Sequence, residues 1–268
     1  MNKTLTGIKP TGEFHLGNYV TLNAAQNATY LVADLHALNA LPFEKVTEYR
    51  TDLIKALNAL GYSPIVVQSE TPKIMELYTY LLPLVSEGVL HRMHAYKASD
   101  GTPNMGLVTY PVLMTADIMA SGCTHVAVGE DQIQHLELAR DLVAKYNSHY
   151  KTSFAIPEAQ IVSSTLVGTD GRKMSKSYGN TLPLFAPEAV IRKKIKLIKM
   201  DSRAPSEEKP DAEENIAYQI LKAISPSVAA DTITPLKEGR MGYGELKTVL
   251  TNTFFDLFGN ARKIYGTT

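Results

Sequence analysis

The sequence predicts an α/β fold, with a Rossmann-like parallel sheet covered by helices and a small helical domain after it. Short apolar runs alternate with amphipathic helical patterns in the N-terminal part, the order typical of βαβ units. From Asn215 onward, apolar residues recur at helical spacing. The 268 residues, 44% of them hydrophobic, suffice for one large and one smaller domain. We therefore predict domains at 1–180 and 181–268.

Each element of the first domain has its own signal. The runs that read as buried strands are 3–6, 28–33, 65–67 and 125–128. The segments with helical periodicity are 16–26, 44–60, 72–88, 107–121 and the stretch after 128 through Tyr146. We expect a bend near Pro83, and Pro111 in a first helical turn, where proline is tolerated.

The composition changes after Ser177. Residues 172–199 carry eight Lys or Arg and one acid, Glu188, and a charged, proline-containing linker follows at 201–214. The whole chain has zero net charge, so it lacks a global basic field for nucleic acid. Its single cysteine, Cys123, excludes an intrachain disulfide framework. Because we find no secretory leader and no long apolar run, we expect a soluble cytoplasmic protein without a membrane partner.

The segment 172–177 places Lys173 and Lys176 three residues apart, with serines between and after them. Lysine ammoniums are compact charges on flexible stems, and hydroxyl groups add donors. The run therefore suits a mobile loop that grips a triphosphate. A solvated turn is the alternative for such a Gly-Lys-Ser-rich stretch.

The segment 7–19 is a second candidate anion site. A strand, a Gly/Pro turn and a helix follow one another there, so free backbone N–H groups and the helix dipole face the turn. His15 and Asn18 share a face if the first helical turn forms. The alternative is an ordinary βα turn with an exposed histidine.

Two further segments carry candidate ligands. Tyr110, Met114 and Asp117 lie on one face of an apolar helix. This face suits a ligand with a large apolar body and one donor. From these residues alone, a structural acid satisfied by a neighbouring backbone group or an arginine is the favoured alternative for Asp117. Residues 128–135 follow a strand, where ligands of α/β sheets bind. Their acids can also be a helix N-terminus that is favoured by the dipole.

Together these segments resemble a known family. His15-Leu-Gly-Asn18 and Lys173-Met-Ser-Lys-Ser177 resemble the paired "HIGH" and "KMSKS" motifs of class I aminoacyl-tRNA synthetases. The segments 6–12, 34–37, 110–118, 128–138 and 242–244 resemble tryptophanyl-tRNA synthetases in particular. The similarity runs from Leu5 to about Lys247.

The resemblance implies a tryptophan–tRNA ligase that makes tryptophanyl-adenylate from tryptophan and ATP and then transfers the tryptophanyl group to tRNA(Trp). It implies that Asp117 binds the indole N–H. The other tryptophan-binding residues that it implies are Leu5, Gly7, His36, Tyr110, Met114 and Gln132. The catalytic residues that it implies are His15, Asn18, Lys173, Lys176 and Ser177. The ATP-binding residues that it implies are Lys9, Thr11, Gly17, Asn18, Gly129, Asp131, Met174 and Lys176.

The resemblance also implies Mg²⁺ held by ATP phosphates rather than by a protein ligand cluster, and a homodimer. Leu5 has no polar atom where tyrosyl enzymes carry a tyrosine, so tryptophan is the expected substrate. Leu5 also replaces a common phenylalanine, and Lys9 replaces a common glutamine. The C-terminal region that follows residues 242–244 is expected to be shortened. The basic run 192–196 is either a tRNA contact or a solvated helix face.

Two other functions stay open at this point. A non-charging paralogue that binds tryptophan or RNA as a regulator fits a shortened C-terminus, although the intact lysine loop argues against it. A tyrosyl-type synthetase shares the fold and has an aspartate at a similar place.

Overall fold

The computed structural model describes residues 3–93, 104–162 and 165–267. Contacts divide the chain into two compact units. Unit 1 consists of Met1–Thr11 and Ala24–Ser163, and unit 2 consists of Gly12–Asn23 and Ser164–Thr268. The sheet belongs to unit 1, and the "HIGH"-like and "KMSKS" motifs belong to unit 2. The division at 180/181 that the sequence indicates is a functional assignment and stays a prediction.

Unit 1 contains a five-stranded sheet in the order β3-β2-β1-β4-β5. Its strands are β1 (Thr4–Ile8), β2 (Thr29–Val32), β3 (Ile65–Val67), β4 (His125–Val128) and β5 (Glu158–Ile161). All neighbouring strands pair in parallel, which confirms the predicted Rossmann-like sheet. The strand order reverses between β1 and β4. In open α/β sheets, ligands bind at the carboxyl ends of the strands beside such a reversal.

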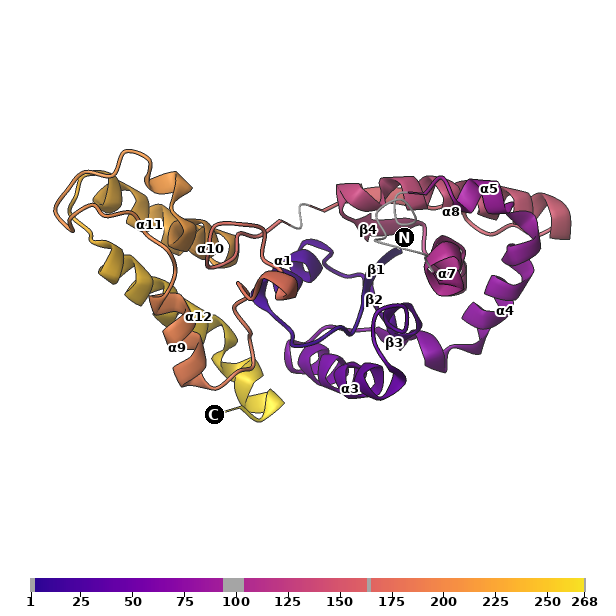
Figure 1. Cartoon of the computed structure of the whole chain (residues 1–268), viewed down its shortest axis with the longest axis horizontal. Helices are drawn as coiled ribbons and strands as arrows, with labels where there is room; N and C mark the ends of the chain where they lie inside the picture. The colour runs from indigo at the N-terminus through magenta and orange to yellow at the C-terminus, as the bar shows by residue number, and fades with distance from the viewer. Residues whose placement is uncertain (1–2, 94–103, 163–164, 268) are drawn as a thin grey trace. The chain divides into compact units, whose positions relative to one another are not determined.

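Helices cover the sheet and one another in unit 1 (Figure 1). They are α2 (Asp34–Ala37), α3 (Phe43–Ala59), α4 (Pro72–Leu81), α5 (Glu87–Leu90), α7 (Met105–Ser121) and α8 (Ile133–Tyr150). Helix α7 packs on both α4 and α8. Its fully buried Val112 and Ala116 join Leu77 of α4 and Leu142 of α8 in the core. A helix so apolar on all sides is held by its neighbours, which fixes the direction of its few polar side chains.

Two expectations for these helices are wrong. Helix α7 begins at Met105, because the Asn104 side chain accepts from Leu107 N and caps it there. Pro111 therefore lies inside α7 rather than in its first turn. The helix expected over 72–88 is interrupted: α4 ends at Leu81, a 3₁₀ turn η2 (Leu82–Leu84) follows, and α5 begins at Glu87. Pro83 lacks the N–H that would continue the helix.

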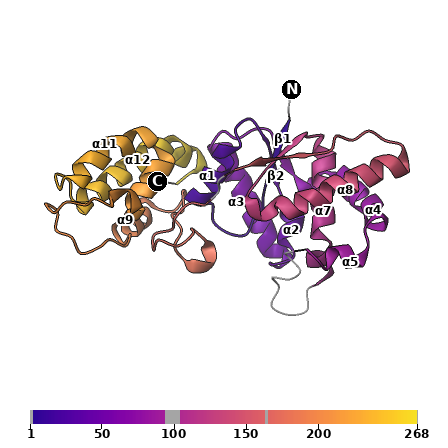
Figure 2. The same ribbon diagram turned by 90° about the horizontal axis from the view of Figure 1, so that it is seen from above.

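Unit 2 contains α1 (Leu16–Ala24) up to Asn23, followed by the elements beyond 164. Its helices are α9 (Glu188–Lys196), α10 (Ile216–Ile224), α11 (Pro226–Lys237) and α12 (Tyr243–Tyr265). Helix α10 packs on α11 and α12 (Figure 1). Helix α9 packs on α12 (Figure 2). The fully buried Phe254 and Phe258 of α12 lie in this core. The helical character expected of the C-terminal region is thus confirmed.

The segment 201–214 is a folded part of unit 2 rather than a solvated linker. Lys209 is fully buried and donates to the backbone oxygens of Ala204, Pro205 and Glu207. Such a buried ammonium is tolerated because three carbonyl acceptors replace its water.

Candidate functional site

The "HIGH"-like turn in unit 2 begins α1. Asn18 Oδ1 accepts a hydrogen bond from His15 N at 3.1 Å, so the side chain closes the first turn. This use of Oδ1 leaves the Nδ2 group of Asn18, with its two donors, as the end that can reach a ligand. His15 is 8% exposed, and its Nδ1 is buried without a hydrogen-bond partner among the described residues. An orphaned buried nitrogen is uncommon and is a candidate contact for a bound group.

Burial, aided by the charge of Lys176, lowers the pKa of His15 to about 4. The imidazole is therefore neutral at pH 7 and offers one N–H donor rather than a positive charge. Burial also lowers the pKa of Lys176 to about 8, against the opposing influence of Glu13. A lysine with such a pKa is still mostly charged at pH 7 but is easily perturbed.

The two motifs contact each other through glycines. A Cβ on Gly17 would lie 3.1 Å from two ring atoms of His15 and 3.5 Å from the sulfur of Met174. A Cβ on Gly12 would lie 3.5 Å from Cδ of Lys176. The predicted phosphate-binding residues of the two motifs are therefore brought together inside unit 2, although they are far apart in the sequence.

The lysine-serine loop is folded back on itself at its base. Val167 and Lys173 form an antiparallel bridge, and Met174 N donates to Leu166 O at 2.7 Å. Met174 is buried, whereas the side chains of Lys173 and Ser177 are exposed. The ammonium of Lys173 and the hydroxyl of Ser177 are therefore accessible on a loop with a fixed base, an arrangement that suits phosphate binding.

Asn180 holds this base and was missed by sequence reasoning. Its Oδ1 accepts from Ser175 N at 2.8 Å, and its Nδ2 donates to Asp170 Oδ1 and Lys173 O. It is 3% exposed, and a Cβ on Gly168 would come within 2.3 Å of its amide. The signal for it is weak, because one asparagine after a Ser-Tyr-Gly run looks like any turn residue.

The predicted tryptophan-binding residues lie in unit 1. Asp117 is 3% exposed on α7 and accepts from Gln68 Nε2 at 2.8 and 3.0 Å through its two oxygens. His36 Nε2 lies 3.0 Å from Asp117 Oδ2. Burial raises the pKa of Asp117, while the bonds from His36 and Gln68 act in the opposite direction. Since a carboxylate offers about four lone pairs, Asp117 keeps capacity for a ligand donor beside these contacts.

Tyr110 is the second polar group on the same face of α7. Its hydroxyl lies 2.5 Å from His135 Nε2, and its ring meets His36 edge to face at 5.8 Å. Burial, together with the charge of Asp131, raises the pKa of Tyr110 to about 12, so the phenol stays protonated at neutral pH. Tyr110 and Asp117 thus both contact His36, whereas Met114 packs against the apolar core of unit 1.

The other predicted residues follow β1 and β4. Leu5 is buried in β1, and a Cβ on Gly7 would meet nothing within 4 Å, so this glycine leaves open space. After β1, Thr11 N donates to Lys9 O and closes a turn. After β4, Gly129 precedes the 3₁₀ turn η3 (Glu130–Gln132), in which Gln132 Nε2 donates to Asp131 Oδ2 at 2.8 Å. Lys9, Thr11, Gly129 and Asp131 therefore lie just beyond the strands at which the sheet order reverses.

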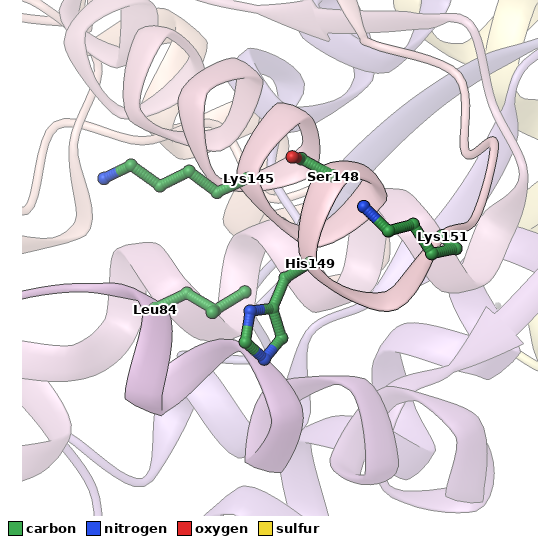
Figure 3. Close-up of a pocket in the computed structure, with 5 residues that line it drawn as sticks. All are labelled: Leu84, Lys145, Ser148, His149 and Lys151. Atoms are coloured by element: carbon green, nitrogen blue, oxygen red, sulfur yellow. The ribbon is translucent and has the colours of Figure 1, made fainter.

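Two surface cavities lie away from the predicted site residues. Figure 3 shows a cavity of about 450 Å³ at the C-terminal end of α8, lined by Leu84, Lys145, Ser148, His149 and Lys151. A second cavity of about 310 Å³ in unit 2 is lined by Lys199, Met200, Asp201, Arg203, Asp211, Glu214, Asn215, Ile216 and Tyr243. Neither contains a predicted site residue, so the candidate site rests on side-chain geometry rather than on cavity size.

The part of the chain that the structure describes contains neither a metal-binding cluster nor a membrane-spanning helix. In residues 3–93, 104–162 and 165–267, no group of three or more His, Cys, Asp or Glu is arranged to hold a metal ion. Within the same ranges, no helix has the length and apolar character needed to cross a bilayer.

Comparison with known proteins identifies the family. Residues 1–259 match the family described as "tRNA synthetases class I (W and Y)". The chain belongs to this family. It is 38% identical to a tryptophan–tRNA ligase of Rhodopirellula baltica, over 97% of the chain and 87% of that protein. It is also 38% identical to the tryptophan–tRNA ligase of Fusobacterium nucleatum, over 98% and 86% of the two chains.

A solved structure agrees with these relatives. The tryptophanyl-tRNA synthetase of Campylobacter jejuni, complexed with ADP and tryptophan, superposes with a TM-score of 0.87 at 34% identity, over 98% of this chain and 88% of that one. The class I synthetase fold and the resemblance drawn from the motifs are both confirmed.

Proposed function

We propose that this chain is a tryptophan–tRNA ligase, which activates tryptophan with ATP and transfers the tryptophanyl group to tRNA(Trp). The observation that carries this proposal is the buried Asp117, an acceptor fixed by Gln68 and His36 on an otherwise apolar helix. Such a site selects a large apolar ligand with one N–H donor, and the indole of tryptophan is that ligand. The tryptophan–tRNA ligases among its relatives support the same substrate.

In the first step, a carboxylate oxygen of tryptophan attacks the α-phosphorus of ATP and expels pyrophosphate. No covalent enzyme nucleophile takes part, so the rate gain comes from positioning and from stabilising charge on the phosphates. Lys173 and Lys176 offset the charge that develops on pyrophosphate, and Ser177 adds a hydroxyl donor. Neutral His15 and the Nδ2 group of Asn18 donate to phosphate oxygens. Gly17 and Met174 keep these groups together.

The residues beyond β1 and β4 take the rest of the two substrates. Lys9 and Thr11 bind ATP phosphate oxygens, while Gly129 and Asp131 hold the ribose. Tyr110 and Gln132 hold the amino-acid head group of tryptophan. Leu5, Gly7, His36 and Met114 surround its indole ring. In the second step, a terminal ribose hydroxyl of tRNA attacks the adenylate carbonyl, and AMP leaves.

Mg²⁺ accompanies ATP in this proposal, bound through phosphate oxygens, as is usual for an ion that keeps much of its water. The basic residues 192–196 of α9 contact tRNA phosphates. The proposal also includes work in the cytoplasm, a homodimer, and a division of labour between a catalytic domain at 1–180 and a tRNA-binding domain at 181–268.

Tryptophan-dependent exchange of pyrophosphate into ATP tests the first step, and acylation of tRNA(Trp) tests the second. We expect both activities. A folded protein that gave no exchange with any amino acid would rule out the enzyme. Exchange with tyrosine instead of tryptophan would indicate a tyrosyl enzyme, and exchange without acylation would indicate a non-charging paralogue.

A further inference from the structure

Gln68 lies at the start of the 3₁₀ turn η1 (Gln68–Glu70), directly after β3, and is fully buried. Its Oε1 accepts from Leu35 N at 2.9 Å and from His36 N at 3.3 Å, and its Nε2 donates to both oxygens of Asp117. The amide therefore links the beginning of α2 to the carboxylate on α7.

The orientation of this amide is fixed by its neighbours. Backbone N–H groups can only donate, so the Gln68 atom that faces Leu35 and His36 must be the oxygen. The NH₂ group must then face Asp117. The adjoining turn is fixed in the same way, because Asp34 accepts from Leu35 N and Ser69 N, both at 3.0 Å, and pairs with Arg50. Gln68 consequently has no freedom to rotate and offer its oxygen to Asp117.

We infer that Gln68 is a specificity-determining positioning residue, which keeps the Asp117 carboxylate in one orientation and surrounded by N–H donors. Because Gln68 supplies only donors, Asp117 remains an acceptor, and the ligand group that completes its shell must itself donate. An indole N–H meets that requirement, whereas an isosteric ring with oxygen in place of N–H leaves two acceptors facing each other. The inference rests on the proposed function, since it concerns how tryptophan is recognised.

The test uses tryptophan and its benzofuran analogue, in which oxygen replaces the indole N–H. The chain contains no tryptophan, so a change in indole emission on binding comes from the added amino acid and is not mixed with emission from protein tryptophan. Gln68→Met removes the amide at similar volume. We expect tryptophan affinity to fall by about 10- to 100-fold, the preference over the benzofuran analogue to shrink, and the KM for ATP to stay within about twofold.

Gln68→Glu separates positioning from packing. Its carboxyl can still accept from Leu35 N and His36 N, but two adjacent carboxylates share one proton. We expect tryptophan to bind the Glu variant weakly near pH 9 and more tightly as the pH falls to about 6, relative to the Met variant at each pH. Asp34 of α2, His36, Arg50 of α3, and Tyr110 with His135 also surround this network, and comparison of the two variants cancels their titration.

Thr115→Val is the matched control, because Thr115 is fully buried on the same helix and its hydroxyl donates only to Pro111 O. We expect lower thermal stability with unchanged tryptophan affinity. Wild-type affinity and selectivity in Gln68→Met would overturn the inference. If that variant does not fold, a Gln68→Glu variant with the pH dependence of the wild type overturns it. Failure of the wild type itself to exchange with tryptophan would instead overturn the proposed function.

Discussion

Asp117 in unit 1 and Lys176 in unit 2 are ionisable groups that are shielded from water in two different environments. Asp117 is 3% exposed, and its oxygens face N–H groups of Gln68 and the ring nitrogen of His36. Lys176 is half-buried and has no ion-pair partner among the described residues, and burial lowers its pKa to about 8. The Asp117 carboxyl is thus surrounded by hydrogen-bond donors in the protein without ligand, whereas the Lys176 ammonium has no carboxylate partner among the described residues.

The difference follows from the ligands. A neutral N–H group gives a weak interaction, so its acceptor must be oriented in advance for the contact to discriminate. In the proposed function, a triphosphate carries several charges and would supply the counter-charge that Lys176 lacks, so the protein without ligand can keep that ammonium partly desolvated. In the proposed function, discrimination thus comes from the fixed network around Asp117 in unit 1, and Lys176 in unit 2 contributes to reactivity.

The largest effect is expected when the ammonium of Lys176 is removed. We expect Lys176→Ala to lower the rate of pyrophosphate exchange by roughly 10²- to 10³-fold, because it removes a charge that faces the leaving group. Tryptophan affinity should not change. Steady-state exchange kinetics measure the rate, and Lys222→Ala at an exposed position of α10 serves as a control. A normal rate for Lys176→Ala would show that the loop does not act on the phosphates.

Removal of the oriented acceptor gives the next largest effect. Asp117→Asn places amide donors where the indole N–H must bind, so we expect the KM for tryptophan to rise by about 10²-fold while the KM for ATP stays constant. Measurement of both constants separates the two substrates. Unchanged amino-acid selectivity would assign Asp117 a structural role and would favour another aromatic substrate.

Sequence alone predicts what depends on local pattern. Strands β2 to β4 appear as apolar runs, and β1 corresponds to the short strand expected at 3–6. Asp117 stands out because it is an acid on an apolar helix. Strand β5 was missed, because its residues Glu-Ala-Gln-Ile are mostly exposed and only half apolar. Gln68 could have been predicted, because it directly follows β3 and ligands bind beyond the carboxyl ends of strands.

Asn180 and Lys209 had no such signal. Their importance comes from contacts made only when the chain has folded, since Asn180 joins both sides of the lysine loop and Lys209 meets three carbonyl groups. A polar residue in a turn-rich segment reads as solvated until its burial is known. The position of Pro111 inside α7 could not be predicted for the same reason. Helix α7 begins at Met105 because the Asn104 side chain caps it, and the direction of that side chain is known only from the structure.

A smaller effect is expected when the base of the lysine-serine loop loses the Asn180 side chain that holds it. Asn180→Ala leaves Ser175 N and Lys173 O without their buried partner, so we expect about a 10-fold higher KM for ATP, in line with roughly 1–3 kcal/mol for unsatisfied groups. Thermal unfolding should shift to lower temperature, and tryptophan affinity should not change. Asn252→Ala, at an exposed position of α12, controls for the substitution itself. An unaltered KM for ATP would show that the loop does not depend on Asn180 for its position.

The smallest expected effect is the pH dependence of the KM for ATP, which is measured on the unsubstituted protein. In the proposed function, it is the charged form of Lys176 that binds phosphate. With its pKa at about 8, Lys176 is mostly protonated below that pH and roughly nine-tenths neutral one unit above it. We therefore expect the KM for ATP to rise several-fold between about pH 7.5 and about pH 9, with the KM for tryptophan flat. Lys176→Arg should remove the rise, because a guanidinium stays charged over this range. Glu13→Gln should move the rise to lower pH, because the charge of Glu13 raises the pKa of Lys176. A rise that persists unchanged in both variants would assign the pH dependence to a group other than Lys176. The proposed difference between Lys176, which awaits an anionic ligand, and Asp117, which is oriented before its ligand binds, would then no longer hold.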